Sequence, residues 1–505
     1  MNDNLRFRNA FVFVLAASSA LAQTRVEIIE PEDRSNPQIV KLTLSPAAEP
    51  VPALKHSLWP RHEERTPGNA APYYYRAVLM TVEGRDRVHK HLQEKYGEEF
   101  YQEWLSARPE DLPRDGLQML IRGSAMSELK AAVYREQCDW DLRLRDLRGM
   151  DTIAFLLPEV QEMRELARHL SLKAKLEVAD GELGKAVETL LLGYKLAQDT
   201  AQPKTLVNDL VGIAVAGVCN ETLLEIVASP DSPNLYWALA QVPTPLIDLR
   251  PAMQYEMQLP LKIFPFLKDP EQESRSPEQW RQFIITAISD LQDLGGDSNQ
   301  IGYLNAWQEQ LVATAIAMKG YPWAKRELIG LGYDRQRVEA MPVGQVIAIH
   351  QSNVYRYTYQ EMFKWSLLPF WQAQPKMQRS LDKLRSEGYL KTGADAKEIL
   401  PIVSLLLPAT EAASQAGIRL QRDLAALRVI EAIRMHAAGG GKFPKSLGEI
   451  SVVPVPRDPL TGESFVYELK DGKAMLSLTR PPGSTIRLPR PRVFELSLRN
   501  PRIKP

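Results

Sequence analysis

The sequence predicts a mostly α-helical protein with an irregular body of helical hairpins and a small C-terminal α+β subdomain. Two observations indicate this fold class. Apolar residues recur every three or four positions over residues 158–228, which is the period of amphipathic helices. Near the end of the chain the period changes to alternation about Asp471-Gly472, the signal of a β-hairpin.

The strongest helical signal is a hairpin that begins at Pro158, because proline suits the first turn of a helix. Its apolar face continues to about Ala179, where Asp180-Gly181 supplies a tight turn. A return helix follows through Ala197. The next apolar run, 206–227, is apolar over more than half of its circumference, so we expect it to be a central helix.

The N-terminus is typical of an export signal. Arg6 and Arg8 precede an apolar stretch, and Ala20-Leu21-Ala22 offers small residues for a signal peptidase, so we expect cleavage before Gln23. The apolar stretch is short for a membrane span. The expected mature protein is therefore exported to the periplasm or beyond the cell, without a transmembrane anchor.

Composition divides the chain into five segments. The expected boundaries are a signal peptide at 1–22, an extended Pro-rich arm at 23–68, an α-helical body at 69–438, a β-hairpin subdomain at 439–480 and a Pro-rich basic tail at 481–505. Frequent prolines place a further boundary within the body near 229–245. The last long helices, over 395–437, are expected to be interrupted at Pro401 and Pro408.

Charge and motifs exclude several functions. The chain has 62 basic and 62 acidic residues, and this balance argues against nucleic acid as a partner. It has no HExxH, GxSxG, paired CxxC or Walker A pattern. Glu165 and His169 are four apart but favour a plain surface pair over a metal site. We therefore expect neither a cofactor nor a metal.

Two stretches are candidate ligand sites. Tyr355, Tyr359 and Phe363 lie four residues apart on an expected helix, and such an aromatic stripe forms either a groove for a peptide or glycan or part of the core. The second is Asp139-Trp140-Asp141, where carboxylates flank a ring that could stack on a sugar. The alternative places Trp140 in the core.

Only two cysteines are present, Cys138 and Cys219. In an oxidising compartment two thiols can form a disulfide. The alternative, two separately buried thiols that pack as small apolar residues, stays open from the sequence.

Several stretches resemble a family of uncharacterised exported proteins from planctomycete-type bacteria. The matching residues are the 69–74 start (Asn-Ala-Ala-Pro-Tyr-Tyr), Cys138-Asp139-Trp140, the 166–215 helices, Ala432-Ile433-Arg434 through Pro444, Leu447, Pro456-x-Asp458-Pro459-x-x-Gly462 and Tyr467. This resemblance spans most of 69–480 and implies export and a helical body, without an activity.

Two shorter resemblances add detail. The 158–200 hairpin resembles half of a tetratricopeptide repeat (TPR) at Gly181, Ala186, Leu190 and Gly193, without tandem copies. The C-terminal part is similar to the pseudopilins of type II secretion, although the acidic, glycine-rich calcium loop of those proteins is missing after Leu478.

Taken together, these features favour a non-enzymatic binding or scaffolding module of the cell envelope, whose partner is an envelope protein or a glycan. The alternative is a hydrolase on a helical scaffold that acts on glycan or peptide. A pocket where several carboxylates or a histidine converge would favour the hydrolase.

Overall fold

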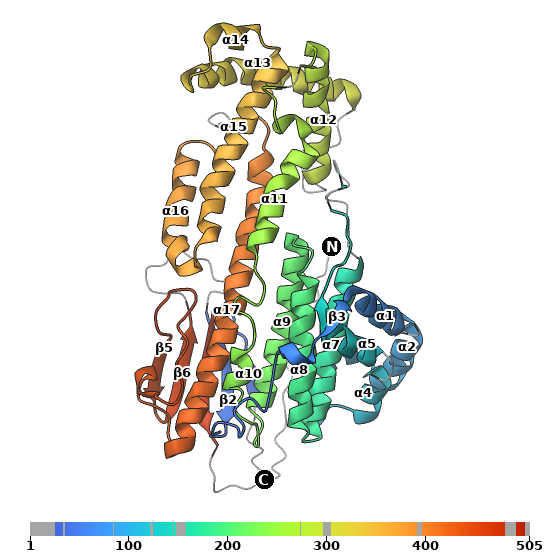
Figure 1. The fold of residues 1–505 in the computed structure, drawn as a ribbon, viewed down its shortest axis with the longest axis vertical. Helices are drawn as coiled ribbons and strands as arrows, with labels where there is room; N and C mark the ends of the chain where they lie inside the picture. The colour runs from blue at the N-terminus through green and yellow to red at the C-terminus, as the bar shows by residue number, and fades with distance from the viewer. Residues whose placement is uncertain are drawn as a thin grey trace, which may run out of the picture.

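A computed structural model gives the fold. It describes residues 26–33, 36–83, 85–121, 125–144, 146–147, 158–272, 274–295, 305–390, 396–479 and 491–499. The expected signal peptide at 1–22 lies outside the described residues. The molecule is elongated, and a long C-terminal helix, α17, connects a lower part that holds the β-sheet to an upper part made of helices (Figure 1).

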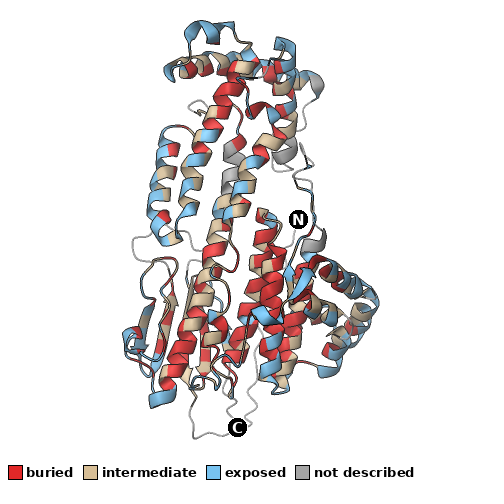
Figure 2. Ribbon diagram, viewed as in Figure 1, coloured by how far each residue is buried: buried red, intermediate tan, exposed pale blue. Residues whose placement is uncertain are grey.

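The predicted hairpin and central helix form the core of the lower part. They are α7 (Pro158–Ala179), α8 (Leu183–Thr200) and α9 (Leu206–Val227), which pack against one another. Gly181 makes the expected turn at φ 77°. Among the described helices, α9 alone has the length and composition to cross a membrane, but it is mostly buried between α8, α7 and α17 (Figure 2). This burial agrees with the prediction of a central helix.

Short helices cover the outer side of α7 and α8 (Figure 1). They are α1 (Ala71–Val82), α2 (Arg85–Tyr96), α3 (Phe100–Ser106), α4 (Arg114–Ile121) and α5 (Ala125–Val133). A small parallel pair, β3 (Thr66–Asn69) and β4 (Arg135–Gln137), holds the start of α1 near the end of α5.

The lower part also contains a five-stranded sheet of order β1-β2-β7-β6-β5. Its strands are β1 (Val26–Ile29), β2 (Gln38–Leu44), β5 (Val466–Lys470), β6 (Lys473–Leu478) and β7 (Arg492–Leu498). Strands β5 and β6 form the predicted hairpin, with Asp471 and Gly472 both at positive φ. The predicted mostly α fold with a small C-terminal β-containing subdomain is thus confirmed.

Two of the expected segments are wrong. The arm at 23–68 contributes β1 and β2, and the tail at 481–505 contributes β7, which pairs in parallel with β2 and antiparallel with β6. The reason is alternation: Val40, Leu42 and Leu44 of β2 point into the core, as do Phe494 and Leu496 of β7. The two ends of the chain therefore complete one sheet.

The upper part consists of helices (Figure 1). They are α11 (Arg250–Ile263), α12 (Pro277–Gly295), α13 (Ala306–Gly330), α14 (Arg335–Ala340), α15 (Val343–Phe363) and α16 (Phe370–Ser386). Short α10 (Tyr236–Ala240) lies in the lower part, against α17. Single 3-10 turns occur at His62–Glu64, Pro109–Asp111, Pro265–Leu267, Lys364–Leu367 and Leu447–Glu449.

Helix α17 (Ile402–Gly440) has 39 residues, about 58 Å at the usual rise, and ends at Gly441 with φ 64°. The expected interruption at Pro408 is wrong, because the helix continues through it.

Two buried arginines, Arg434 and Arg422, connect α17 to the lower part. Arg434 pairs with Glu431 at 2.7 Å, with both side chains 0% exposed, and also donates to the carbonyls of Ser45 and Ser232. Arg422 forms a bidentate pair with Asp458 at 2.8 and 2.6 Å.

Candidate ligand-binding pocket

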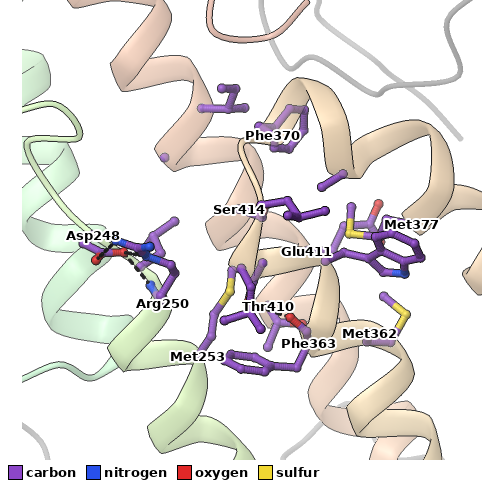
Figure 3. Close-up of a pocket in the computed structure, with 18 of the residues that line it drawn as sticks. Asp248, Arg250, Met253, Met362, Phe363, Phe370, Met377, Thr410, Glu411 and Ser414 are labelled. Carbon is purple, nitrogen blue, oxygen red and sulfur yellow. Dashed lines mark hydrogen bonds and ion pairs between the residues drawn. The ribbon is translucent and has the colours of Figure 1, made fainter.

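A cavity of about 510 Å³ lies where the upper helices meet α17 (Figure 3). Its walls come from the loop at 244–249, the start of α11, the end of α15, the turn and first half of α16, and residues 410–421 of α17. The volume lies within the range of small-molecule sites. Five stretches that are distant in sequence thus enclose one space.

The aromatic stripe predicted from the sequence forms part of this wall. Tyr355, Tyr359 and Phe363 all line the cavity, with ring centroids 5.8 and 6.3 Å apart along α15. The Tyr359 hydroxyl donates to the Met253 carbonyl at 2.7 Å, and that of Tyr355 donates to the Met257 carbonyl. Burial raises the pKa of both phenols, so they stay neutral. Each ring is held in place by a backbone contact across to α11.

Most of the remaining lining is apolar and includes three methionines, whose flexible side chains adapt to a ligand. These residues are Ile247, Leu249, Met253, Met362, Trp365, Leu367, Leu368, Phe370, Ala373, Met377, Leu381 and Ile418. Gly417 lets the loop approach α17 closely, because a Cβ at that position would meet Leu249 Cδ1 at 2.5 Å.

Polar side chains also line the pocket: Thr244, Asp248, Arg250, Glu256, Thr358, Ser366, Thr410, Glu411, Ser414 and Gln421. Arg250 forms a bidentate pair with Asp248 at 2.8 and 2.7 Å, and this contact lowers the pKa of that carboxyl. Burial raises the pKa of Glu256, whose closest hydrogen-bond donor is the Leu206 amide at 3.5 Å. The hydroxyl of Thr358, a fully buried residue, has no hydrogen-bond partner among the described atoms. Figure 3 shows Asp248 and Arg250 at one side and Glu411 at the other.

Asp139-Trp140-Asp141, the second predicted site, does not form a binding surface around its ring. Trp140 is only 9% exposed, stacks on Tyr74 at 5.6 Å and donates its indole N–H to the Asp199 carbonyl at 2.7 Å. Asp139 and Asp141 are exposed. The indole therefore has the core position that the sequence left open, because its N–H finds a buried acceptor.

Cys138 and Cys219 are free thiols, so the disulfide is absent from the structure. Cys138 approaches the Asp199 carbonyl, whereas Cys219 lies against Gly193. These contacts on α8 are six residues apart, about 9 Å along the helix, which is too far for one disulfide to span. Burial raises the pKa of Cys219 to about 12, so it packs as a small apolar side chain.

His169 and Glu165 belong to a structural cluster away from the pocket. Glu165 accepts from the Tyr101 hydroxyl at 2.8 Å and pairs with Arg168. Burial lowers the pKa of His169 to about 4, so its ring is neutral. Within the described ranges, no group of three or more His, Cys, Asp or Glu side chains is arranged to hold a metal ion.

Sequence reasoning found one wall of the pocket and missed the others. Glu256 and Met253 are three residues apart on α11, a spacing that places them on one helix face. Nothing in their local pattern indicates that this face meets α15 and α17.

The fold and the pocket define a mostly α-helical protein with a C-terminal α+β subdomain and one apolar cavity between its upper helices and α17. No match was found for this chain among protein-family models, curated proteins or solved structures.

Proposed function

We propose that this chain is an exported, non-enzymatic binding protein that holds an apolar ligand in the cavity beside α15. The observation that carries the proposal is the lining itself: aromatic, methionine and aliphatic side chains from five stretches enclose about 510 Å³. Apolar concavities with a few polar groups are the usual form of ligand sites.

The lining favours an apolar ligand over a glycan. Sugars are held by many hydrogen bonds, but both tyrosine hydroxyls already donate to backbone carbonyls. Asp248 and Arg250 likewise satisfy each other. The other polar lining residues, among them Glu256, Glu411 and Gln421, are outnumbered by the apolar ones.

A hydrolase is the second candidate, and Glu256 is the observation in its favour. A carboxyl whose pKa is raised by burial suits a general acid, and Glu411 lines the same cavity. However, the described lining contains no histidine, cysteine or lysine that could serve as a base or nucleophile. Turnover of a glycan or peptide substrate by the native protein, and its loss in Glu256→Gln, would favour the hydrolase.

Export and an envelope location are part of the proposal. They are supported by the sequence of residues 1–22, with Arg6 and Arg8 ahead of an apolar stretch and Ala20-Leu21-Ala22 at its end. N-terminal sequencing of the protein secreted by a bacterial host is expected to find Gln23 as the first residue. The TPR resemblance of the α7–α8 hairpin supports an added scaffolding role.

Binding can be tested with an uncharged fluorescent probe, N-phenyl-1-naphthylamine. We expect saturable fluorescence enhancement with the native protein. Ser414 lies centrally among the lining residues in Figure 3, so Ser414→Trp fills the cavity and should abolish the enhancement. Ser414→Ala is the matched control and should bind normally. Equal binding by both variants, each with a native circular dichroism spectrum, would refute the proposed site.

A further inference from the structure

The charges around the cavity are unequal. Asp248, Glu256 and Glu411 are the carboxylates of the lining, and Arg250 is its cation. Arg250 is already engaged with Asp248 through two hydrogen bonds. Neither Glu256 nor Glu411 forms an ion pair with any residue that the structure describes. Glu411 is exposed to solvent, but the partly buried Glu256 faces an apolar space without a protein cation to balance it.

We infer that the pocket selects an amphiphilic cation, a small molecule with one long apolar chain and a single ammonium group, and this inference rests on the proposed binding function. The chain occupies the methionine and aliphatic part of the cavity. The ammonium group lies between Glu256 and the aromatic stripe. The complementary charge comes from the ligand, because the lining does not supply it.

The aromatic wall supports the same choice. An ammonium group is attracted to the face of an aromatic ring, and the attraction strengthens when water is excluded. Tyr355, Tyr359 and Phe363 line the cavity. Tyr359 is also close enough to Glu256 for the carboxylate to contribute to its raised phenol pKa. A cation beside Tyr359 therefore meets a ring and a carboxylate together.

Thr358 adds an unpaired polar group to the same wall. Its side chain is buried, lines the cavity and has no hydrogen-bond partner among the described atoms. A buried hydroxyl without a partner is unfavourable. Its oxygen has almost no accessible surface, so an ammonium group would reach it only after the Thr358 side chain turns towards the cavity.

An anionic amphiphile is disfavoured by the same geometry. A fatty acid carboxylate in this cavity would lie near the partly buried Glu256, and like charges that are shielded from water repel each other. The charge of Arg250 is already balanced by Asp248, so it offers an anionic head group little net attraction.

The test uses three twelve-carbon probes that differ only in their head group: dodecylamine, dodecanol and dodecanoate. Each displaces N-phenyl-1-naphthylamine from the full-length protein below its micelle concentration. We expect dodecylamine to bind at least tenfold more tightly than dodecanoate, with dodecanol between them. The double variant Glu256→Gln, Glu411→Gln should reduce dodecylamine to the affinity of dodecanol and leave dodecanol unchanged.

The control is Glu361→Gln on α15, which removes a carboxylate that pairs with Lys364 and does not line the cavity. It should leave the order of the three probes unchanged. Equal affinities, a preference for dodecanoate, or an unchanged preference in the double variant would overturn the inference while the binding function stands. Failure of all three probes to bind would overturn the proposed function and the inference with it.

Discussion

Asp209 makes stability depend on pH in a predictable direction. The side chain is 0% exposed at the start of α9, and neither carboxylate oxygen has a hydrogen-bond partner among the described residues. Burial raises the pKa of this carboxyl, the charge of Lys204 lowers it by a smaller amount, and the charge of Asp248 raises it further. The resulting pKa is about 8. In the unfolded chain the pKa is about 3.9. The folded protein therefore holds this proton far more tightly than the unfolded chain does.

The direction and the size of this pH dependence follow from the difference between the folded and unfolded pKa values. A folded-state pKa above the unfolded value gives stability that is fully present below about pH 4 and is lost as the pH rises to about 8. Each pH unit in that window costs about 1.4 kcal/mol, up to about 6 kcal/mol in total. Asp209→Asn imitates the protonated carboxyl. Its free energy of unfolding should therefore exceed that of the native protein by about 1.4 kcal/mol for each pH unit in this window.

The assay is urea denaturation followed by circular dichroism, at unit steps from pH 4 to pH 9, for the native protein, Asp209→Asn and the control Asp231→Asn. Asp231 is exposed, so its substitution should give a difference that is flat with pH. The Asp209→Asn difference should be near zero at pH 4 and level off above pH 8. A flat difference, or a variant that is less stable at pH 8, would refute a buried, uncompensated carboxyl at this position.

Three further predictions address packing, the buried ion pair and the pocket. Gly193→Ala should destabilise the protein by about 1–3 kcal/mol, because the new Cβ would collide with the Cys219 sulfur, and Cys219→Ala should restore most of the loss in the double variant as measured by denaturation. Glu431→Gln leaves the Arg434 charge buried and should cost about 3–5 kcal/mol, whereas adding Arg434→Met should recover part of it in the same assay. Burial raises the pKa of Glu256, so dodecylamine, protonated throughout, should bind more tightly from pH 5 to pH 8, and Glu256→Gln should remove that rise in a displacement titration.

Local sequence patterns were sufficient to predict the helices and strands whose partners are close in sequence. The bounds expected for α7 and α9 agree with the structure, because each helix carries a long periodic apolar face. Asp471-Gly472 likewise specified the β5–β6 hairpin, because both residues tolerate positive φ.

The pairing of strands that are distant in sequence could not be predicted from local sequence patterns. Gln38–Leu44 and Arg492–Leu498 alternate, but each is short and lies among prolines, and the partner strand is at the other end of the chain. Helix α13 shows that apolar spacing does not ensure burial: Trp307 and Met318 keep helical spacing but are 60% and 76% exposed. Spacing identifies a helix face, whereas the tertiary structure decides whether that face is covered.

The candidate site was predictable to the same extent. Tyr355, Tyr359 and Phe363 were identified because they share one face of one helix, and they do line the cavity. The choice between a ligand site and a core position for Trp140 stayed open from the sequence, because its acceptor, the Asp199 carbonyl, lies 59 residues away. The opposite walls on α11, α16 and α17 have no local signature, since a cavity is a property of how helices meet.

Photoaffinity labelling tests the central claim, that the cavity between α15 and α17 is where a ligand binds. A dodecylamine with a diazirine in its chain would be irradiated with the full-length protein, and the labelled peptides would be mapped by mass spectrometry. The account predicts labels in 244–263, 355–381 and 410–421 that disappear in Ser414→Trp and persist in Ser414→Ala. Labels concentrated instead on the exposed face of α13, at Trp307 and Met318, and unaffected by Ser414→Trp, would contradict it.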